Sequence, residues 1–206
     1  MESQHYIQSK NTEISQGDIF RDLSFSYKIP SDDGDLLIQF PFPYAVVLTQ
    51  ACDLSQHYNQ LKKNLQLDAI GTDEALSKKS DDKILDTILV CPAYPHEKFL
   101  EGQHIEERKM NDFDGKKGQA SALKHLILNE RYHRYHYLSA FGDDASRIFP
   151  EMIIDFKRFH TIPLEALVMN YHKSYLGSLR ELYRERLSQR FSNYLSRIGL
   201  PDDQKE

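Results

Sequence analysis

The sequence predicts an α+β fold in which a curled, mostly antiparallel sheet packs against a long C-terminal amphipathic helix. Three observations support this prediction. Short β-branched segments dominate the first half of the chain, the longest helical pattern comes last, and strands and helices do not alternate as they do in doubly wound folds. The 206 residues are sufficient for one domain, so we expect residues 1–206 to fold as a single unit.

The first half of the chain contains the strand signals. Residues 1–12 are polar and indicate a loose N-terminal arm, whereas residues 14–95 are expected to form the sheet core. The predicted strands lie at 14–20, 36–40, 44–50 and 86–91. Residues 44–50 are short, β-branched and apolar on both faces, which is typical of a central strand.

Helices and irregular segments fill the rest of the chain. A helix over 56–64 is expected after the strand at 44–50, with Asp53 or Ser55 as its cap. The charged, glycine-containing stretch 96–118 indicates an irregular excursion. Residues 119–170 are predicted to hold a helix and further strands, with the helix at 119–129 and the strands at 132–138, 152–156 and 159–162.

A C-terminal helix over 173–198 has the clearest periodicity. Apolar side chains recur there at spacings of three and four, which places them on one stripe of a helix that must be buried. They are Leu176, Leu179, Tyr183, Leu187, Phe191, Tyr194 and Ile198. Gly199 and Pro201 then form a helix stop.

Charge and composition limit the class of protein. The net charge is -5 and the pI is near 6.0, so the whole molecule is not suited to coat nucleic acid or an anionic membrane. Its two cysteines do not form a disulfide framework, and no apolar run is long enough for a secretory signal or a membrane span. We therefore expect a cytoplasmic protein without membrane contact.

Part of the chain resembles the MazF/PemK toxin family. The G-D-I-F run at 17–20 is similar to the opening of that family's first strand, and the Y-A-V-V-L run at 44–48 is similar to its central strand. The I-L-V-C run at 88–91 corresponds to the next strand. The resemblance covers residues 14–95 and implies a small SH3-like barrel with ribonuclease activity.

Two positions depart from the family pattern. The family has an arginine immediately before its central strand, where this chain has Phe42, Pro43 and Tyr44, and a Thr or Ser near the position of Cys91. Both departures affect positions that would carry the ribonuclease chemistry. Residues 47–54, 134–138 and 197–201 also resemble an uncharacterised family of bacterial proteins, which implies a bacterial origin.

Cys52 is the first candidate for chemistry. It follows a buried strand and precedes a helix start, where the helix dipole favours a thiolate. Asp53 and His57 are four residues apart, so a helix beginning there places them on one face. A catalytic group of Cys52, Asp53 and His57 is one interpretation. The other is a small packed side chain at a corner of the chain.

A histidine-rich stretch is the second candidate. His133, His136 and His160 are candidates to join Asp155 around a metal ion. His133 and His136 are three residues apart, however, and on a strand they point to opposite faces. We therefore expect no metal site. No phosphate-loop or dinucleotide-binding glycine pattern occurs in the chain, so we expect no cofactor either.

Arginines on the C-terminal helix are the third candidate. Arg180, Arg184, Arg186 and Arg190 are an unusual excess on one helix of an acidic protein, and arginine is well suited to bind phosphate or carboxylate. A protein partner is the expected ligand of this surface, and nucleic acid is a second one. The alternative is a solvated face, or pairing with acidic loops of the same chain.

These observations favour a non-catalytic binding or accessory module, and the toxin resemblance suggests a toxin–antitoxin or phage-defence operon. The alternative is an enzyme, either a diverged MazF/PemK-like ribonuclease or a hydrolase based on Cys52. The oligomeric state does not follow from the sequence.

Overall fold

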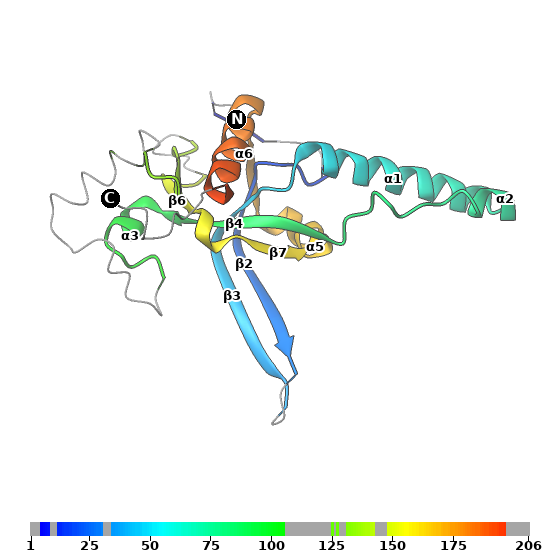
Figure 1. Cartoon of the computed structure of the whole chain (residues 1–206), viewed down its shortest axis with the longest axis horizontal. Helices are drawn as coiled ribbons and strands as arrows, with labels where there is room; N and C mark the ends of the chain where they lie inside the picture. The colour runs from blue at the N-terminus through cyan, green and yellow to red at the C-terminus, as the bar shows by residue number, and fades with distance from the viewer. Residues whose placement is uncertain are drawn as a thin grey trace, which may run out of the picture.

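The computed structural model describes residues 5–8, 12–30, 34–105, 125, 127, 131–142 and 148–196. Eight strands within these ranges form one sheet, and every pairing between them is antiparallel. The sheet curls into a half-barrel, and helices pack on it (Figure 1). This confirms the predicted α+β class with a curled antiparallel sheet.

The strands differ widely in length, and β2 and β3 are much the longest. Their bounds in chain order are β1 (Tyr6–Ile7), β2 (Asp18–Ile29), β3 (Leu36–Val47), β4 (Thr87–Pro95), β5 (Tyr135–Leu138), β6 (Met152–Asp155), β7 (His160–Pro163) and β8 (Tyr175–Leu179). Neighbouring strands follow the order β1-β8-β2-β3-β4-β6-β5, and β7 pairs with β4 beside that path. The two edges of this path are therefore β1 and β5.

The curl of the sheet brings its two edges together. The hydroxyl of Tyr6 on β1 donates to the carbonyl oxygen of Ser139, one residue after β5, at 2.6 Å. These residues are 133 positions apart in the chain. The seam between β1 and β5 is thus closed by a side-chain contact instead of a ladder of backbone hydrogen bonds.

Strand β4 is central because it pairs with three others. One side pairs with β3, while the other side pairs with β7 over residues 87–90 and with β6 over residues 93–95. Cys91 lies between the two partners on that side, and its thiol donates to the carbonyl oxygen of Asp155 at 3.1 Å.

Helices cover both faces of the sheet. Their bounds are α1 (Ala51–Ile70), α2 (Asp73–Leu76), α3 (His96–Leu100), the 3₁₀ helix η1 (Phe156–Arg158), α5 (Leu164–Ser174) and α6 (Glu181–Leu195). Leu187 and Phe191 of α6 join one core cluster, whereas Leu54 of α1 and Leu167 of α5 join a second cluster. Along a strand, successive side chains contribute alternately to the first cluster and to the second cluster.

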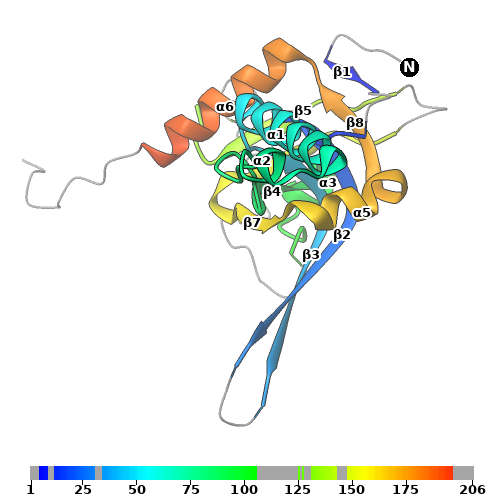
Figure 2. The same cartoon turned by 90° about the vertical axis from the view of Figure 1, so that its right-hand side faces the viewer.

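Two segments extend away from the body. The β2–β3 hairpin points in one direction, and α1 with α2 points in another (Figures 1 and 2). The first half of α1 is anchored by the buried side chains of Leu54 and His57. Further along the helix, Leu61, Leu65 and Ile70 are exposed.

The predicted C-terminal helix is wrong at its N-terminal end. Residues 175–179 form β8, and α6 runs from Glu181 to Leu195 in place of the predicted 173–198. A spacing of three between Leu176 and Leu179 suits a helical stripe, but pairing with β1 and β2 satisfies their backbone groups here. Residues 197–198 lie outside the described part of the chain.

Several other boundaries differ from the predictions. The predicted strands 36–40 and 44–50 are one strand, β3, and β4 continues through Pro92 to Pro95. Helix α1 is longer than the predicted 56–64, and its N-cap is Gln50 in place of Asp53 or Ser55. The predicted 1–12 arm contains β1. The excursion at 96–118 begins with α3, and its residues 106–118 lie outside the described ranges.

The predicted helix 119–129 falls mostly outside the described ranges, although His125 and Ile127 are helical. The strands predicted at 152–156 and 159–162 correspond to β6 and β7. Within the described residues, no helix has the length and apolar character required to cross a bilayer.

Candidate functional site

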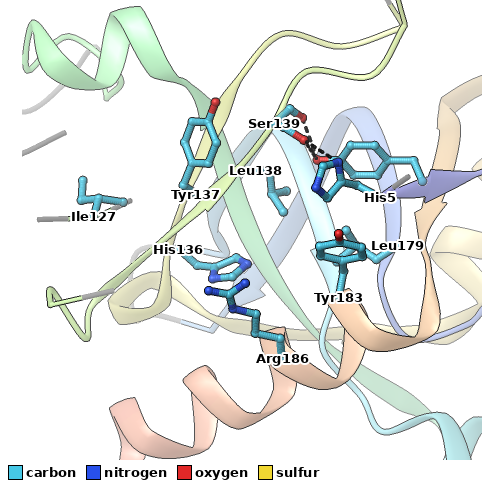
Figure 3. A pocket seen from close by; sticks show the side chains of 10 residues that line it. His5, Ile127, His136, Tyr137, Leu138, Ser139, Leu179, Tyr183 and Arg186 are labelled. Carbon is cyan, nitrogen blue, oxygen red and sulfur yellow. Dashed lines mark hydrogen bonds between the residues drawn. The ribbon is translucent and has the colours of Figure 1, made fainter. Parts of the chain in front are cut away.

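A cavity of about 140 Å³ lies at the seam between the two sheet edges, beside α6. Its walls come from β1, β5 with the residue after it, the end of β8, and α6 (Figure 3). The lining residues are His5, Tyr6, Ile127, His136, Tyr137, Leu138, Ser139, Leu179, Tyr183 and Arg186. The cavity therefore exists only because the sheet curls and α6 packs across the seam.

Local structure explains how the polar side chains reach the cavity. Successive residues of β5 alternate between faces, so His136 and Leu138 share the side on which α6 packs. Tyr183 and Arg186 are three residues apart on α6, which places them on neighbouring parts of one helix face. In Figure 3 the ring of His136 and the guanidinium of Arg186 point toward each other.

Hydroxyl groups and an imidazole form a chain along the β1 side of the cavity. The hydroxyl oxygens of Ser139 and Tyr6 are 3.4 Å apart, and the Ser139 hydroxyl lies 3.5 Å from Nδ1 of His5. The His5 ring packs edge-on against Tyr183 with a centroid separation of 4.3 Å. Burial raises the pKa of Tyr6, so its phenol is a neutral donor near pH 7.

His136 is the buried titratable group of the cavity. Its ring is nearly parallel to the ring of Phe156, with centroids 6.2 Å apart. Burial, together with the positive charges of Arg190 and Arg186, lowers the pKa of His136 to about 3. The imidazole is therefore neutral at pH 7.

The described residues that line the cavity carry a positive charge. Arg186 carries a fixed charge, and none of the ten lining residues named above is acidic. Glu151 lies outside the lining set and hydrogen-bonds the Tyr137 side chain, where burial and this carboxylate raise the phenol pKa. The arrangement is suited to hold a small anion by charge and hydrogen bonding.

The four predicted arginines do not share one surface. Arg190 is buried, and its guanidinium donates to the carbonyl oxygens of Tyr132 at 3.1 Å and Tyr135 at 2.6 Å. Arg184 packs over Gly17, and its guanidinium lies 3.9 Å from Glu181.

Arg180 is the N-cap residue of α6, and only Arg186 among the four lines the cavity. The four arginines therefore have different surroundings and do not form one continuous face. Partner or nucleic-acid binding by Arg180, Arg184, Arg186 and Arg190 stays a prediction.

The structure does not assemble a catalytic group from Cys52, Asp53 and His57. Cys52 and Asp53 are exposed, with Sγ and Oδ1 3.6 Å apart. His57 is buried, and its Nδ1 accepts a hydrogen bond from the backbone nitrogen of Leu85 at 2.9 Å.

The geometry of α1 accounts for this separation. Positions 52 and 57 are five residues apart, which rotates them by about 140° around a helix. The interpretation of Cys52 as a packed corner residue is also wrong, because the helix begins before it and leaves its side chain in solvent.

The four residues considered for a metal site have separate surroundings. Asp155 is fully buried and accepts two hydrogen bonds of 2.7 Å from Arg134. His160 packs against the rings of Phe40 and Phe42, while His133 is exposed. Across the described ranges, no cluster of three His, Cys, Asp or Glu side chains is placed to hold a metal ion.

Comparisons of the chain with protein-family models, with curated proteins and with solved structures give no match. The resemblance of residues 14–95 to the MazF/PemK family stays a prediction. Cys91, which takes the position of that family's Ser or Thr, is fully buried, and burial raises its thiol pKa.

Sequence reasoning found Arg186 and His136 but not their neighbours in the cavity. His5 and Tyr6 lay in the segment predicted to be a loose arm, and Tyr183 was assigned only to the apolar stripe. Ser139 has no local pattern that marks it. Its contact with Tyr6 depends on a pairing of sheet edges 133 residues apart, which no local signal reports.

Proposed function

We propose that the protein is a non-catalytic binding module that holds an anionic group of a partner in the cavity between β1, β5 and α6. The observation that carries this proposal is the lining of the cavity, where Arg186 lies beside the imidazole of His136, the imidazole of His5 lies across the cavity, and none of the lining residues in the described part of the chain is acidic. Charge-assisted hydrogen bonds from arginine are among the stronger contacts available for an anion.

The proposal keeps the predicted use of α6 but assigns the role to one arginine. Arg190 anchors β5 to the helix, and Arg184 covers the turn before β2, so both side chains have structural roles in the folded protein. A place in a toxin–antitoxin or phage-defence operon remains part of the proposal and rests on the resemblance of residues 14–95.

Arg186→Gln tests the proposal. Anions that occupy the cavity raise the melting temperature of the wild type, because a ligand that binds only the folded state stabilises it. We expect at least one of inorganic phosphate, sulfate and acetate to do so, with an effect that shrinks as sodium chloride is added. The shift should be lost in Arg186→Gln.

Arg21→Gln is the matched control, because Arg21 is an exposed arginine on the β2–β3 hairpin. It should retain the whole anion-dependent shift. Equal shifts in both variants, or no shift in the wild type with any of the three anions, would contradict the assignment.

A further inference from the structure

We propose that the group accepted by the cavity is a terminal phosphate, carried as a phosphate monoester or as free phosphate, and that His136 takes up a proton when it binds. This inference rests on the proposed function, since it names the ligand class of the same cavity. Three features carry it: the size of the cavity, the directions of its polar groups, and the position of His136 between a ring and two guanidiniums.

The size of the cavity suits a terminal chemical group of a ligand better than a whole drug-sized molecule. At about 140 Å³ it is smaller than the roughly 300–1,000 Å³ typical of pockets that enclose drug-sized ligands. Leu138 and Leu179 are among its walls, so part of the lining is apolar. A terminal group enters such a space, whereas a phosphodiester within a chain needs room to continue on both sides.

The directions of the polar groups favour a tetrahedral anion. His5 comes from the β1 side, His136 and Ser139 come from β5 and the residue after it, and Tyr183 and Arg186 come from α6. These groups surround the cavity on three sides. A planar carboxylate presents its two oxygens in one plane, while a phosphate monoester presents three terminal oxygens in different directions.

His136 is placed to couple binding to proton uptake. The charged groups that face it are Arg186 and Arg190 of α6, its other face stacks on Phe156, and His5 lies across the cavity. Burial, together with the two guanidiniums, holds the pKa of His136 far below its usual range. A bound dianion adds negative charge beside the imidazole and raises that pKa. Binding therefore tightens as the pH falls from about 8 toward 7, a range in which a phosphate monoester stays mostly a dianion.

Calorimetry with four small probes tests the ligand class. At pH 7.5 methyl phosphate is mostly a dianion, dimethyl phosphate is its diester counterpart, inorganic phosphate lacks the ester, and acetate is planar. We expect methyl phosphate to bind at least tenfold more tightly than dimethyl phosphate and acetate. Inorganic phosphate distinguishes free phosphate from a phosphate monoester as the ligand. If its affinity equals that of methyl phosphate, only the phosphate is contacted. Arg186→Gln should weaken methyl phosphate about tenfold to a hundredfold.

Proton uptake is measured in buffers of different ionisation enthalpy. The wild type should take up a proton as methyl phosphate binds, His136→Asn should not, and His172→Asn, which alters an exposed histidine of α5, should behave like the wild type. The His136 ring signal in NMR provides a readout on the unmodified chain. It should titrate at higher pH with methyl phosphate present.

The outcomes separate the two proposals. Acetate binding as tightly as methyl phosphate would overturn the phosphate assignment and leave anion binding intact. Phosphate binding without proton uptake and without a change in the His136 signal would overturn the coupling. If none of the four probes binds, the proposed function itself is contradicted.

Discussion

Asp18 at the start of β2 links the turn before that strand to β8. The residue is 2% exposed, and one carboxylate oxygen accepts a hydrogen bond from the backbone nitrogen of Ser15 at 2.7 Å. The other accepts from the hydroxyl of Ser178 on β8 at 2.6 Å. Burial raises the pKa of Asp18 to about 7, although these bonds and the charge of Arg184 act in the opposite direction.

The raised pKa makes stability depend on pH in a defined direction. Between about pH 4 and pH 7 the folded state keeps a proton on Asp18 that the unfolded chain has lost, so the contribution of Asp18 to the free energy of unfolding falls as the pH rises through this range. This contribution should change by up to about 1.4 kcal/mol per pH unit, which corresponds to one proton. The buried imidazole of His136, whose pKa is lowered, contributes in the opposite direction. The slope that belongs to Asp18 is therefore the difference between the wild type and an Asp18 variant in urea unfolding at a series of pH values.

Asp18→Asn should remove this slope and make the protein more stable than the wild type above pH 7. The amide oxygen can accept from Ser15, and the amide nitrogen can donate to the Ser178 hydroxyl oxygen, so both contacts survive. Asp35→Asn, at an exposed position of the hairpin, is the control. If Asp18→Asn retains the wild-type slope, another group carries the pH dependence.

Individual residues were predictable only where their role is local. The buried strand side chains Val46 and Val47 follow from β-branched character alone. The roles of Arg190 and His57 do not, because each is decided by a distant backbone group: the Tyr135 carbonyl for one and the Leu85 amide for the other. A sequence pattern records the polarity of these side chains but not their partners.

At the scale of elements, α6 links the core to the cavity. Leu187 is 1% exposed at the centre of the apolar stripe, while Leu182 on the same helix is 77% exposed. Leu187→Ala removes packed atoms from the core, so we expect a loss of about 2–5 kcal/mol in the free energy of unfolding. Leu182→Ala should change it by less than about 0.5 kcal/mol.

Thermal melts and urea titrations of the two variants provide the comparison. The same chemical change at two positions of one helix separates burial from helix propensity, because leucine and alanine differ in propensity equally at both sites. Similar losses in the two variants would mean that α6 is not held by its apolar stripe.

The elements that sequence reasoning found share strong local signals, and those it missed depend on distant pairing. The strands β6 and β7 and the second part of β3 are short apolar runs bounded by turn residues. Strand β8 was assigned to a helix because Leu176 and Leu179 have helical spacing. Its strand conformation depends on β1 and β2, which are more than 140 residues away in the chain.

Gly177 marks a further reason for the β8 error. A Cβ at this position would come within 3.0 Å of the Phe141 ring, so the close approach of that ring requires glycine. In a helix, glycine at this position would be destabilising, because glycine loses more backbone conformational freedom on folding than other residues. The glycine was therefore a sequence signal against a helix, and the periodicity around it outweighed that signal.

For the whole molecule, the sheet is shared by two apolar clusters on opposite faces. Val46 belongs to the cluster under α6, and its neighbour Val47 belongs to the cluster under α5 and α1. Because adjacent residues of one strand face the two clusters, neither cluster can lose its strands without exposing the other. The sheet should therefore unfold with both clusters in one cooperative transition, as the predicted single domain requires.

A thiol placed in one cluster can report on damage to the other. Cys91 is fully buried in the cluster under α6, so in a Cys52→Ser background it reacts with a thiol reagent only when that cluster opens. Leu167→Ala creates a cavity in the opposite cluster and should cost about 2–5 kcal/mol. We expect the urea midpoint for Cys91 labelling to fall by the same amount as the midpoint from circular dichroism.

Val168→Ala, at an exposed neighbour on α5, should shift neither midpoint. A Leu167→Ala protein whose circular dichroism midpoint falls while Cys91 stays protected would show that the clusters unfold separately and that the chain is not one cooperative unit.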